Sequence, residues 1–129
     1  MHRAAKGRAG EQYAARALEK AGMRILASNF RSPRGEVDLI ALDGDTLVFV
    51  EVKSWASQGV DGLEYGINRE KQRRIIETAK YFLAAHREYN EMTVRFDVVF
   101  IRGIPPSPPA IPQTGIDIRH LASAFMECV

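Results

Sequence analysis

The stretch Gly35–Lys53 reads GEVDLIALDGDTLVFVEVK and contains two runs of β-forming residues around the turn sequence DGD. An Asp-Gly pair between two such runs is typical of a hairpin turn. The stretch therefore predicts an antiparallel hairpin with strands over Gly35–Leu42 and Thr46–Lys53. This hairpin decides which polar side chains of the region share a face.

The turn sequence leaves two hairpin registers open. A two-residue turn at Asp43-Gly44 places Asp38 diagonal to Glu51, whereas a turn at Gly44-Asp45 places Asp38 directly opposite Glu51. Both registers put the two carboxylates on one face, at a Cβ separation of about 5 Å when opposed and about 7 Å when diagonal. A symmetric three-residue turn would separate them unless a bulge intervened.

Two carboxylates beside apolar Phe49 and Leu47 are unfavourable unless a positive charge neutralises them. A divalent cation would do so, and Mg²⁺ needs only one or two carboxylates because it keeps several waters. Lys53 projects from the same face as Glu51, where it can orient the attacking water or offset transition-state charge. The pattern predicts a phosphodiester hydrolase that depends on Mg²⁺ or Mn²⁺.

The residues before the hairpin predict a helix and a strand. Ala5–Ala21 are good helix formers, and Gly22 stands where a helix commonly ends. Glu11 shares a helical face with small apolar residues such as Ala14. A carboxylate on such an inward face is unfavourable unless it has a partner. We expect Glu11 to support the cation site if this helix crosses the sheet. A short strand is expected over Met23–Phe30.

After the hairpin, Asn68 is expected to cap a helix over Arg69–His86, with Gln72 on its inward stripe. Val94–Ile101 predicts a buried strand, which gives the order α-β-β-β-α-β for the core of an α/β sheet covered by helices. The closing segment IDIRHLASAFMEC predicts a short strand or turn and then a final helix. Loops are expected at Trp55–Ile67 and in the proline-rich segment Gly103–Gly115.

The net charge of +2 is divided unevenly along the chain. Residues 1–35 carry +6, residues 36–68 carry −6 and residues 69–129 carry +2. This distribution fits a phosphate-binding rim around a cation-binding centre, and the alternative is a set of solvated surfaces. The candidate nucleic-acid-binding residues are Arg31, Arg34, Arg69, Lys71, Arg73 and Arg74.

Composition narrows the class of protein. A chain of 129 residues with 46% hydrophobic residues predicts a single domain over 1–129. Its longest apolar run has five residues, Tyr81–Ala85, so no membrane span is expected, and no secretory signal is recognisable. One cysteine excludes an intramolecular disulfide. We therefore expect a cytoplasmic protein.

Asp38, twelve further residues and then Glu51-Val52-Lys53 resemble the PD-(D/E)XK nuclease signature, with Val37 where many members have proline. The segments GRAGEQYAARALEKAGMRILASNFR, GEVDLIALDGDTLVFVEVK, KQRRIIETAKYFL and RFDVVFI resemble the YraN family of bacterial proteins over nearly the whole chain. That family is similar to archaeal Holliday junction resolvases. The resemblance implies a restriction-endonuclease-like single domain with a central mixed β-sheet flanked by helices.

The resemblance also implies roles for individual residues. It implies metal ligation by Asp38, Glu51 and the Val52 carbonyl, a supporting metal role for Glu11, a catalytic role for Lys53 and an active-site position for Gln72. It implies DNA as substrate, with branched DNA as one candidate, and a homodimer, since a four-way junction needs two symmetric cuts. Two alternatives stay open, namely a non-catalytic nucleic-acid-binding or scaffolding module and a hydrolase of RNA or of a small phosphodiester.

Overall fold

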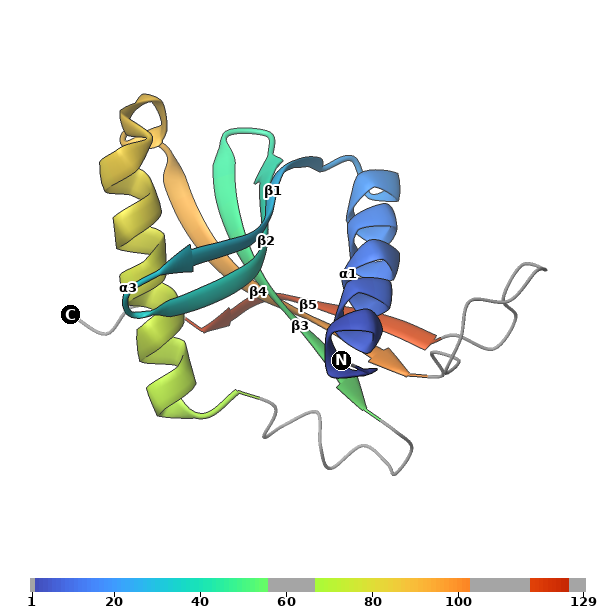
Figure 1. The fold of residues 1–129 in the computed structure, drawn as a ribbon. Helices are drawn as coiled ribbons and strands as arrows, with labels where there is room; N and C mark the ends of the chain where they lie inside the picture. Colours follow the sequence, from blue (N-terminus) through green and yellow to red (C-terminus); the bar gives the residue numbers. More distant parts are fainter. Residues whose placement is uncertain (1, 56–66, 103–116, 126–129) are drawn as a thin grey trace.

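The computed structural model describes residues 2–55, 67–102 and 117–125. Within these ranges the chain has an α/β fold, in which two α-helices flank a five-stranded mixed sheet (Figure 1). The loop expected between Trp55 and Ile67 and the proline-rich segment Gly103–Gly115 lie outside the described residues.

The first helix, α1, spans His2–Lys20, as the helix-forming composition predicted. Gly22, two residues after the last helical residue, has a φ of +98°, which is readily adopted only without a side chain. The Met23 amide donates to the Leu18 carbonyl at 3.0 Å and the Gly22 amide donates to the Glu19 carbonyl at 2.9 Å. These two bonds form a Schellman motif, which ends the helix and directs the chain into the sheet.

The sheet has the strand order β1-β2-β3-β4-β5. Adjacent strands are antiparallel, except for β3 and β4, which are parallel and are joined through the second long helix. The strands span Arg24–Ser32 (β1), Gly35–Asp43 (β2), Thr46–Trp55 (β3), Thr93–Arg102 (β4) and Asp117–Phe125 (β5). The predicted order α-β-β-β-α-β is confirmed, and β5 follows it.

The second long helix, α3, spans Arg69–Ala85, and a short 3-10 helix, η1, follows at Arg87–Tyr89. The side chain of Asn68 accepts a hydrogen bond from the Lys71 amide at 2.8 Å, so the predicted N-cap is confirmed. The buried residues of α3 are Ile75, Thr78, Ala79 and Phe82, and Gln72 is half-buried.

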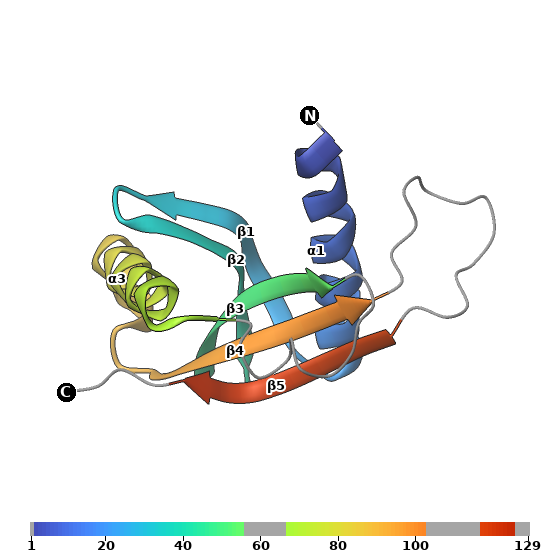
Figure 2. The ribbon, with the colours of Figure 1, turned by 90° about the horizontal axis from the view of Figure 1, so that it is seen from below.

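The two helices cover opposite faces of the sheet (Figures 1 and 2). On the α1 face, Ala14 and Leu18 pack with Leu39, Val48 and Val99. The α3 face is richer in aromatic residues. Its cluster includes Ile75, Phe82, Phe49, Phe96 and Phe100. Successive residues of β3 alternate between these two cores, as strand geometry requires.

The predicted final helix is wrong, because the C-terminal segment forms the edge strand β5. It pairs with β4 from Arg102 opposite Asp117 to Phe96 opposite Phe125, with an irregularity between Phe96 and Val98. Without β5, the backbone donors and acceptors on that side of β4 would have no partner strand. Tertiary pairing therefore overrides the helix-forming composition of the segment.

Candidate active site

The β2–β3 hairpin has the register of the Gly44-Asp45 turn. The ladder pairs Asp43 with Thr46 and continues to Leu39 opposite Val50. The turn is Gly44-Asp45, one of the two open alternatives, and Gly44 has a φ of +60°. Glycine with positive φ at the first central position is typical of a type II′ turn. The paired ladder ends at Leu39 and Val50, and the next residues, Asp38 and Glu51, line one pocket.

The two carboxylates form a partly desolvated pair between β2 and β3. The Val52 amide donates to Asp38 Oδ2 at 2.7 Å, and Glu51 is only 5% exposed. Burial and then the neighbouring charge of Glu51 raise the pKa of Asp38 from 3.8 to about 7. The Val52 hydrogen bond and the charge of Lys71 oppose this rise without cancelling it. The pair therefore strongly favours an added positive charge.

Lys71 provides one such charge, which the sequence interpretation did not anticipate. Its Nζ lies 2.5 Å from Glu51 Oε2, so the side chain points from the first turn of α3 to the carboxylate pair. The sequence pattern predicted Lys71 only as one of the candidate nucleic-acid-binding residues. A signal for the contact was available, because Lys71 precedes the buried Ile75 by four residues and thus shares its helix face.

An open pocket of about 290 Å³ surrounds the pair. It is lined by Gly35, Glu36, Asp38, Glu51, Lys71, Arg74 and Ile75. Gly35 lets β2 approach α3, since a Cβ there would lie 3.3 Å from the Arg74 Cβ. Ser32 Oγ and Thr78 Oγ1 are 3.0 Å apart and tie the β1–β2 turn to the same helix. The close approach of the β2 backbone at Gly35 to α3 therefore sets the position of the helix beside the pocket.

The chemistry of these donors fits a hard divalent cation. Mg²⁺ and Mn²⁺ favour carboxylate oxygens, and one or two carboxylates suffice when water and a phosphate complete the coordination. Asp38 and Glu51 supply the carboxylates from adjacent strands.

Two further predicted site residues, Lys53 on β3 and Gln72 on α3, lie outside the lining of this pocket. Lys53 is half-buried and lies two residues beyond Glu51 on β3, which puts it on the same face by strand alternation. Gln72 donates its side-chain amide to the Ile67 carbonyl at 3.0 Å, so in this conformation it holds the entry to α3. Neither residue lines the pocket.

Glu11 is not among the residues that line the pocket. It is half-buried on α1, which packs on the face of the sheet opposite to α3. Across residues 2–55, 67–102 and 117–125, no three side chains of His, Cys, Asp or Glu lie close enough together to hold a metal ion. The supporting role expected for Glu11 stays a prediction.

The predicted basic residues come from two elements, and Arg74 is the arginine among them that lines the pocket. Arg31 and Arg34 lie at the β1–β2 turn, and α3 contributes Arg69, Arg73 and Arg74. All five side chains are exposed. Three make surface ion pairs, Arg31 with Glu36 at 2.9 Å, Arg34 with Glu77 at 3.3 Å and Arg74 with Glu70 at 3.7 Å. Such pairs are weak, so a phosphate can replace them at low cost.

A second polar cluster centres on Asp97, which is fully buried in β4 on the α1 face. Arg95 donates two hydrogen bonds to it, at 2.9 and 3.0 Å, and His120 Nε2 lies 2.6 Å from its Oδ2. The Ser123 amide donates to its Oδ1 at 3.0 Å. Burial raises the pKa of Asp97, but these hydrogen bonds outweigh burial and leave the pKa below its usual range. The sequence signal for this cluster is a single Asp inside the apolar run of β4.

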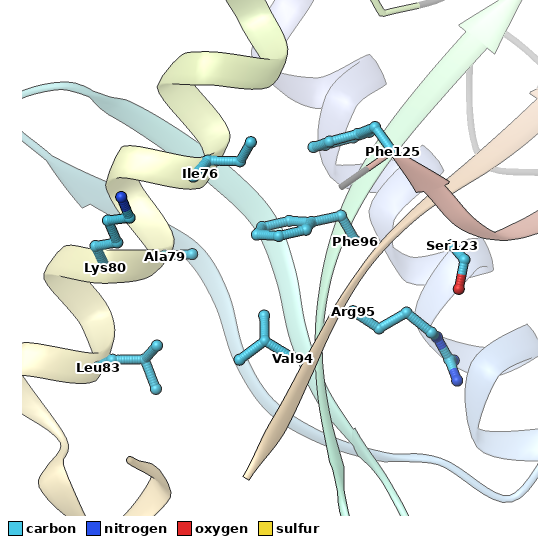
Figure 3. A pocket seen from close by; sticks show the side chains of 9 residues that line it. All are labelled: Ile76, Ala79, Lys80, Leu83, Val94, Arg95, Phe96, Ser123 and Phe125. Atoms are coloured by element: carbon cyan, nitrogen blue, oxygen red, sulfur yellow. The ribbon is translucent and has the colours of Figure 1, made fainter. Parts of the chain in front are cut away.

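A second pocket, of about 250 Å³, lies between α3 and the strands β4 and β5 (Figure 3). Ile76, Leu83, Val94, Phe96 and Phe125 give it an apolar lining, and Arg95 and Ser123 point away from α3. It contains no carboxylate pair. The pocket at Asp38 is therefore the candidate active site.

An α/β fold of this order, with two carboxylates meeting on adjacent strands, is consistent with the restriction-endonuclease-like class. The model of the Uncharacterised protein family UPF0102 matches residues 10–101, and the chain belongs to this family, the YraN family of the sequence resemblance. In the described part of the chain, no helix has the length and apolar character needed to cross a membrane.

Several relatives support this membership over most of the chain. A UPF0102 protein of Treponema pallidum is 44% identical over 128 residues, which are 99% of this chain and 98% of the relative. One from Treponema denticola is 43% identical over 95% of both chains. Another, from Persephonella marina, is 45% identical over 96 residues, which are 74% of this chain and 82% of the relative.

Proposed function

We propose that the protein is a divalent-metal-dependent endonuclease that hydrolyses phosphodiester bonds in DNA, with branched DNA as its candidate substrate. The observation that carries this proposal is the meeting of Asp38 and Glu51 on one face of β2 and β3, in a pocket bordered by Lys71 and Arg74. Buried like charges at such a place are costly, so a function that uses them is favoured over a structural role.

Each group has a role in this proposal. Asp38 and Glu51 would hold Mg²⁺ or Mn²⁺, together with the Val52 carbonyl, and the cation would polarise the phosphoryl oxygens and acidify a water. The Lys53 ammonium would orient the attacking water or offset the charge that develops on the phosphoryl group. The exposed arginines on α3 and on the β1–β2 turn would bind the phosphates on both sides of the scissile bond.

A non-catalytic nucleic-acid-binding or scaffolding module is the second candidate, and the Glu51–Lys71 ion pair favours it. A carboxylate already neutralised by a lysine can serve the fold alone. The two candidates differ in whether Lys53 and a divalent cation matter once DNA is bound.

The deciding experiment incubates wild-type protein, Lys53→Ala and Asp38→Asn with labelled single-stranded, duplex, flap and four-way-junction DNA at low salt. Each mixture contains Mg²⁺, Mn²⁺ or EDTA. Lys20→Ala is the matched control, because Lys20 is an exposed lysine at the far end of α1. We expect metal-dependent cleavage by the wild type and by Lys20→Ala, and loss of cleavage by at least 100-fold in the two site variants.

Binding of equal strength by all four proteins, with no cleavage in any metal, would instead establish the binding module. If the substrate is a four-way junction, we also expect the protein to sediment as a homodimer, since paired cuts need two active sites. A matched RNA substrate in the same assay separates DNA from RNA hydrolysis.

A further inference from the structure

Lys71 reaches the carboxylate pair from the solvent side of the pocket. The Glu51 side chain is 7% exposed, whereas the Lys71 side chain is 42% exposed. Lys71 therefore lies at the rim of the pocket, with its ammonium on the buried Glu51. Lysine is suited to such a position, because its flexible four-carbon stem lets the ammonium move between the carboxylate and the rim.

The ammonium and a divalent cation would compete for the same carboxylates. Lys71 Nζ is within direct contact of Glu51 Oε2, and Asp38 borders the same pocket. A divalent cation bound there would lie within a few ångströms of the ammonium, where like charges repel strongly in a partly desolvated site. One pair of carboxylates cannot bind the ammonium and the divalent cation together without weakening the affinity for each.

The displaced lysine has a defined place to go. Arg74 lines the pocket from the turn of α3 next to that of Lys71, so the pocket already holds a second cation that can bind a phosphate. An ammonium released from Glu51 would join Arg74 at this rim. The exchange would thus turn an internal counter-charge into a phosphate ligand.

We propose that Lys71 is the resident counter-cation of the Asp38–Glu51 pair and a competitor of the divalent cation, which displaces its ammonium from Glu51 toward the phosphate side of the pocket. The proposal rests on the proposed function, because it concerns the same carboxylates. It assigns Lys71 a positioning role distinct from the role of Lys53.

The test measures Mn²⁺ binding by isothermal titration calorimetry in metal-free protein. The proteins are wild type, Lys71→Met, Lys71→Arg and Lys80→Met, the last being the matched control because Lys80 is a lysine of the same helix outside this pocket. We expect Lys71→Met to bind Mn²⁺ about 10-fold or more tightly than wild type, within the usual range of coupling between competing ligands. Lys71→Arg keeps the charge and should bind as wild type does, as should Lys80→Met.

Two negative results remain distinguishable. If the wild type binds Mn²⁺ and Asp38→Asn does not, but Lys71→Met binds no more tightly than Lys80→Met, the competition is overturned while the metal site stands. If none of these proteins binds Mn²⁺, both the competition and the proposed metal-dependent function are overturned.

A second measurement uses the wild-type protein, in case Lys71→Met does not fold. The ¹H–¹³C correlation of the lysine ε-methylene groups is recorded with and without Mg²⁺, and the signal missing in Lys71→Arg identifies Lys71. We expect this signal to move as Mg²⁺ is added, and to stay in place in Asp38→Asn. A Lys71 signal that does not respond to Mg²⁺ in the wild type would overturn the exchange.

Discussion

The most strongly perturbed single residue of the site is Asp38, with a pKa raised from 3.8 to about 7 by burial and by Glu51. An acid with a higher pKa in the folded chain binds more protons when folded, so folded stability falls as pH rises from about 4 to about 7. We expect Asp38→Asn to remove this loss. A shift of this size corresponds to about 4 kcal/mol, of which we expect about 2 kcal/mol, because Asp38 is partly exposed and bonded to Val52.

The measurement is urea unfolding in EDTA at pH 5 and pH 8. Asp38→Asn should have the higher free energy of unfolding at pH 8 and should differ little from wild type at pH 5. Asp45→Asn, an exposed aspartate in the hairpin turn, is the control and should follow wild type at both pH values. A variant less stable than wild type at pH 8 would show that the Asp38 charge stabilises the fold.

Residues on strands could be assigned to a face from the sequence more reliably than residues on helices. Asp38 and Glu51 share a face in either two-residue register, because side chains alternate strictly along a strand. The contact of Lys71 with Glu51 depends instead on the depth to which α3 sits on β2, which the close approach at Gly35 sets. Local sequence contains no direct measure of that depth.

Among the elements, β5 depends most on one buried side chain. Asp97 accepts hydrogen bonds from Arg95 on its own strand and from His120 and Ser123 on β5. We expect Asp97→Ala to destabilise the protein by about 3 kcal/mol or more, since it leaves Arg95 and the Ser123 amide without their buried acceptor. The readouts are urea unfolding and faster hydrogen exchange of β5 amides.

The matched control for this prediction is Asp117→Ala, which removes an aspartate of β5 itself. Asp117 pairs with Arg102 and Arg119 at 3.7 and 3.5 Å near the surface, so its loss should cost less than about 1 kcal/mol. Equal losses in the two variants would mean that the Asp97 network contributes no more than a surface ion pair.

The same network explains why the sequence predicted β4 correctly but predicted a helix after the start of β5. The run VRFDVVFI contains enough β-branched and aromatic residues to define β4 by itself. The β5 segment has exposed residues over most of its length and a Ser123 with a φ of +52°. It is held in place by pairing with β4 and by Asp97, both of which are tertiary contacts that a local pattern does not reveal.

At the scale of the whole molecule, the charge division of the sequence becomes an arrangement in space. The acidic segment supplies Asp38 and Glu51 at the pocket, while the two basic segments meet around it through the β1–β2 turn and the start of α3. The ion pair between Arg34 and Glu77, at 3.3 Å, joins the β1–β2 turn to α3. A single phosphate backbone crossing the pocket would therefore meet cations from both.

This arrangement predicts the salt dependence of DNA binding. We expect the double variant Arg34→Gln and Arg74→Gln to flatten the slope of log affinity against log salt concentration by about 1.8, since each lost phosphate contact on duplex DNA accounts for about 0.9. Fluorescence anisotropy with a labelled duplex, measured in EDTA from low to moderate salt, gives the slope without cleavage. Arg16→Gln and Arg24→Gln remove two exposed arginines from α1 and the start of β1, so this control should leave the slope unchanged. An equal change in both double variants would mean that net charge alone, and not the rim of this pocket, attracts DNA.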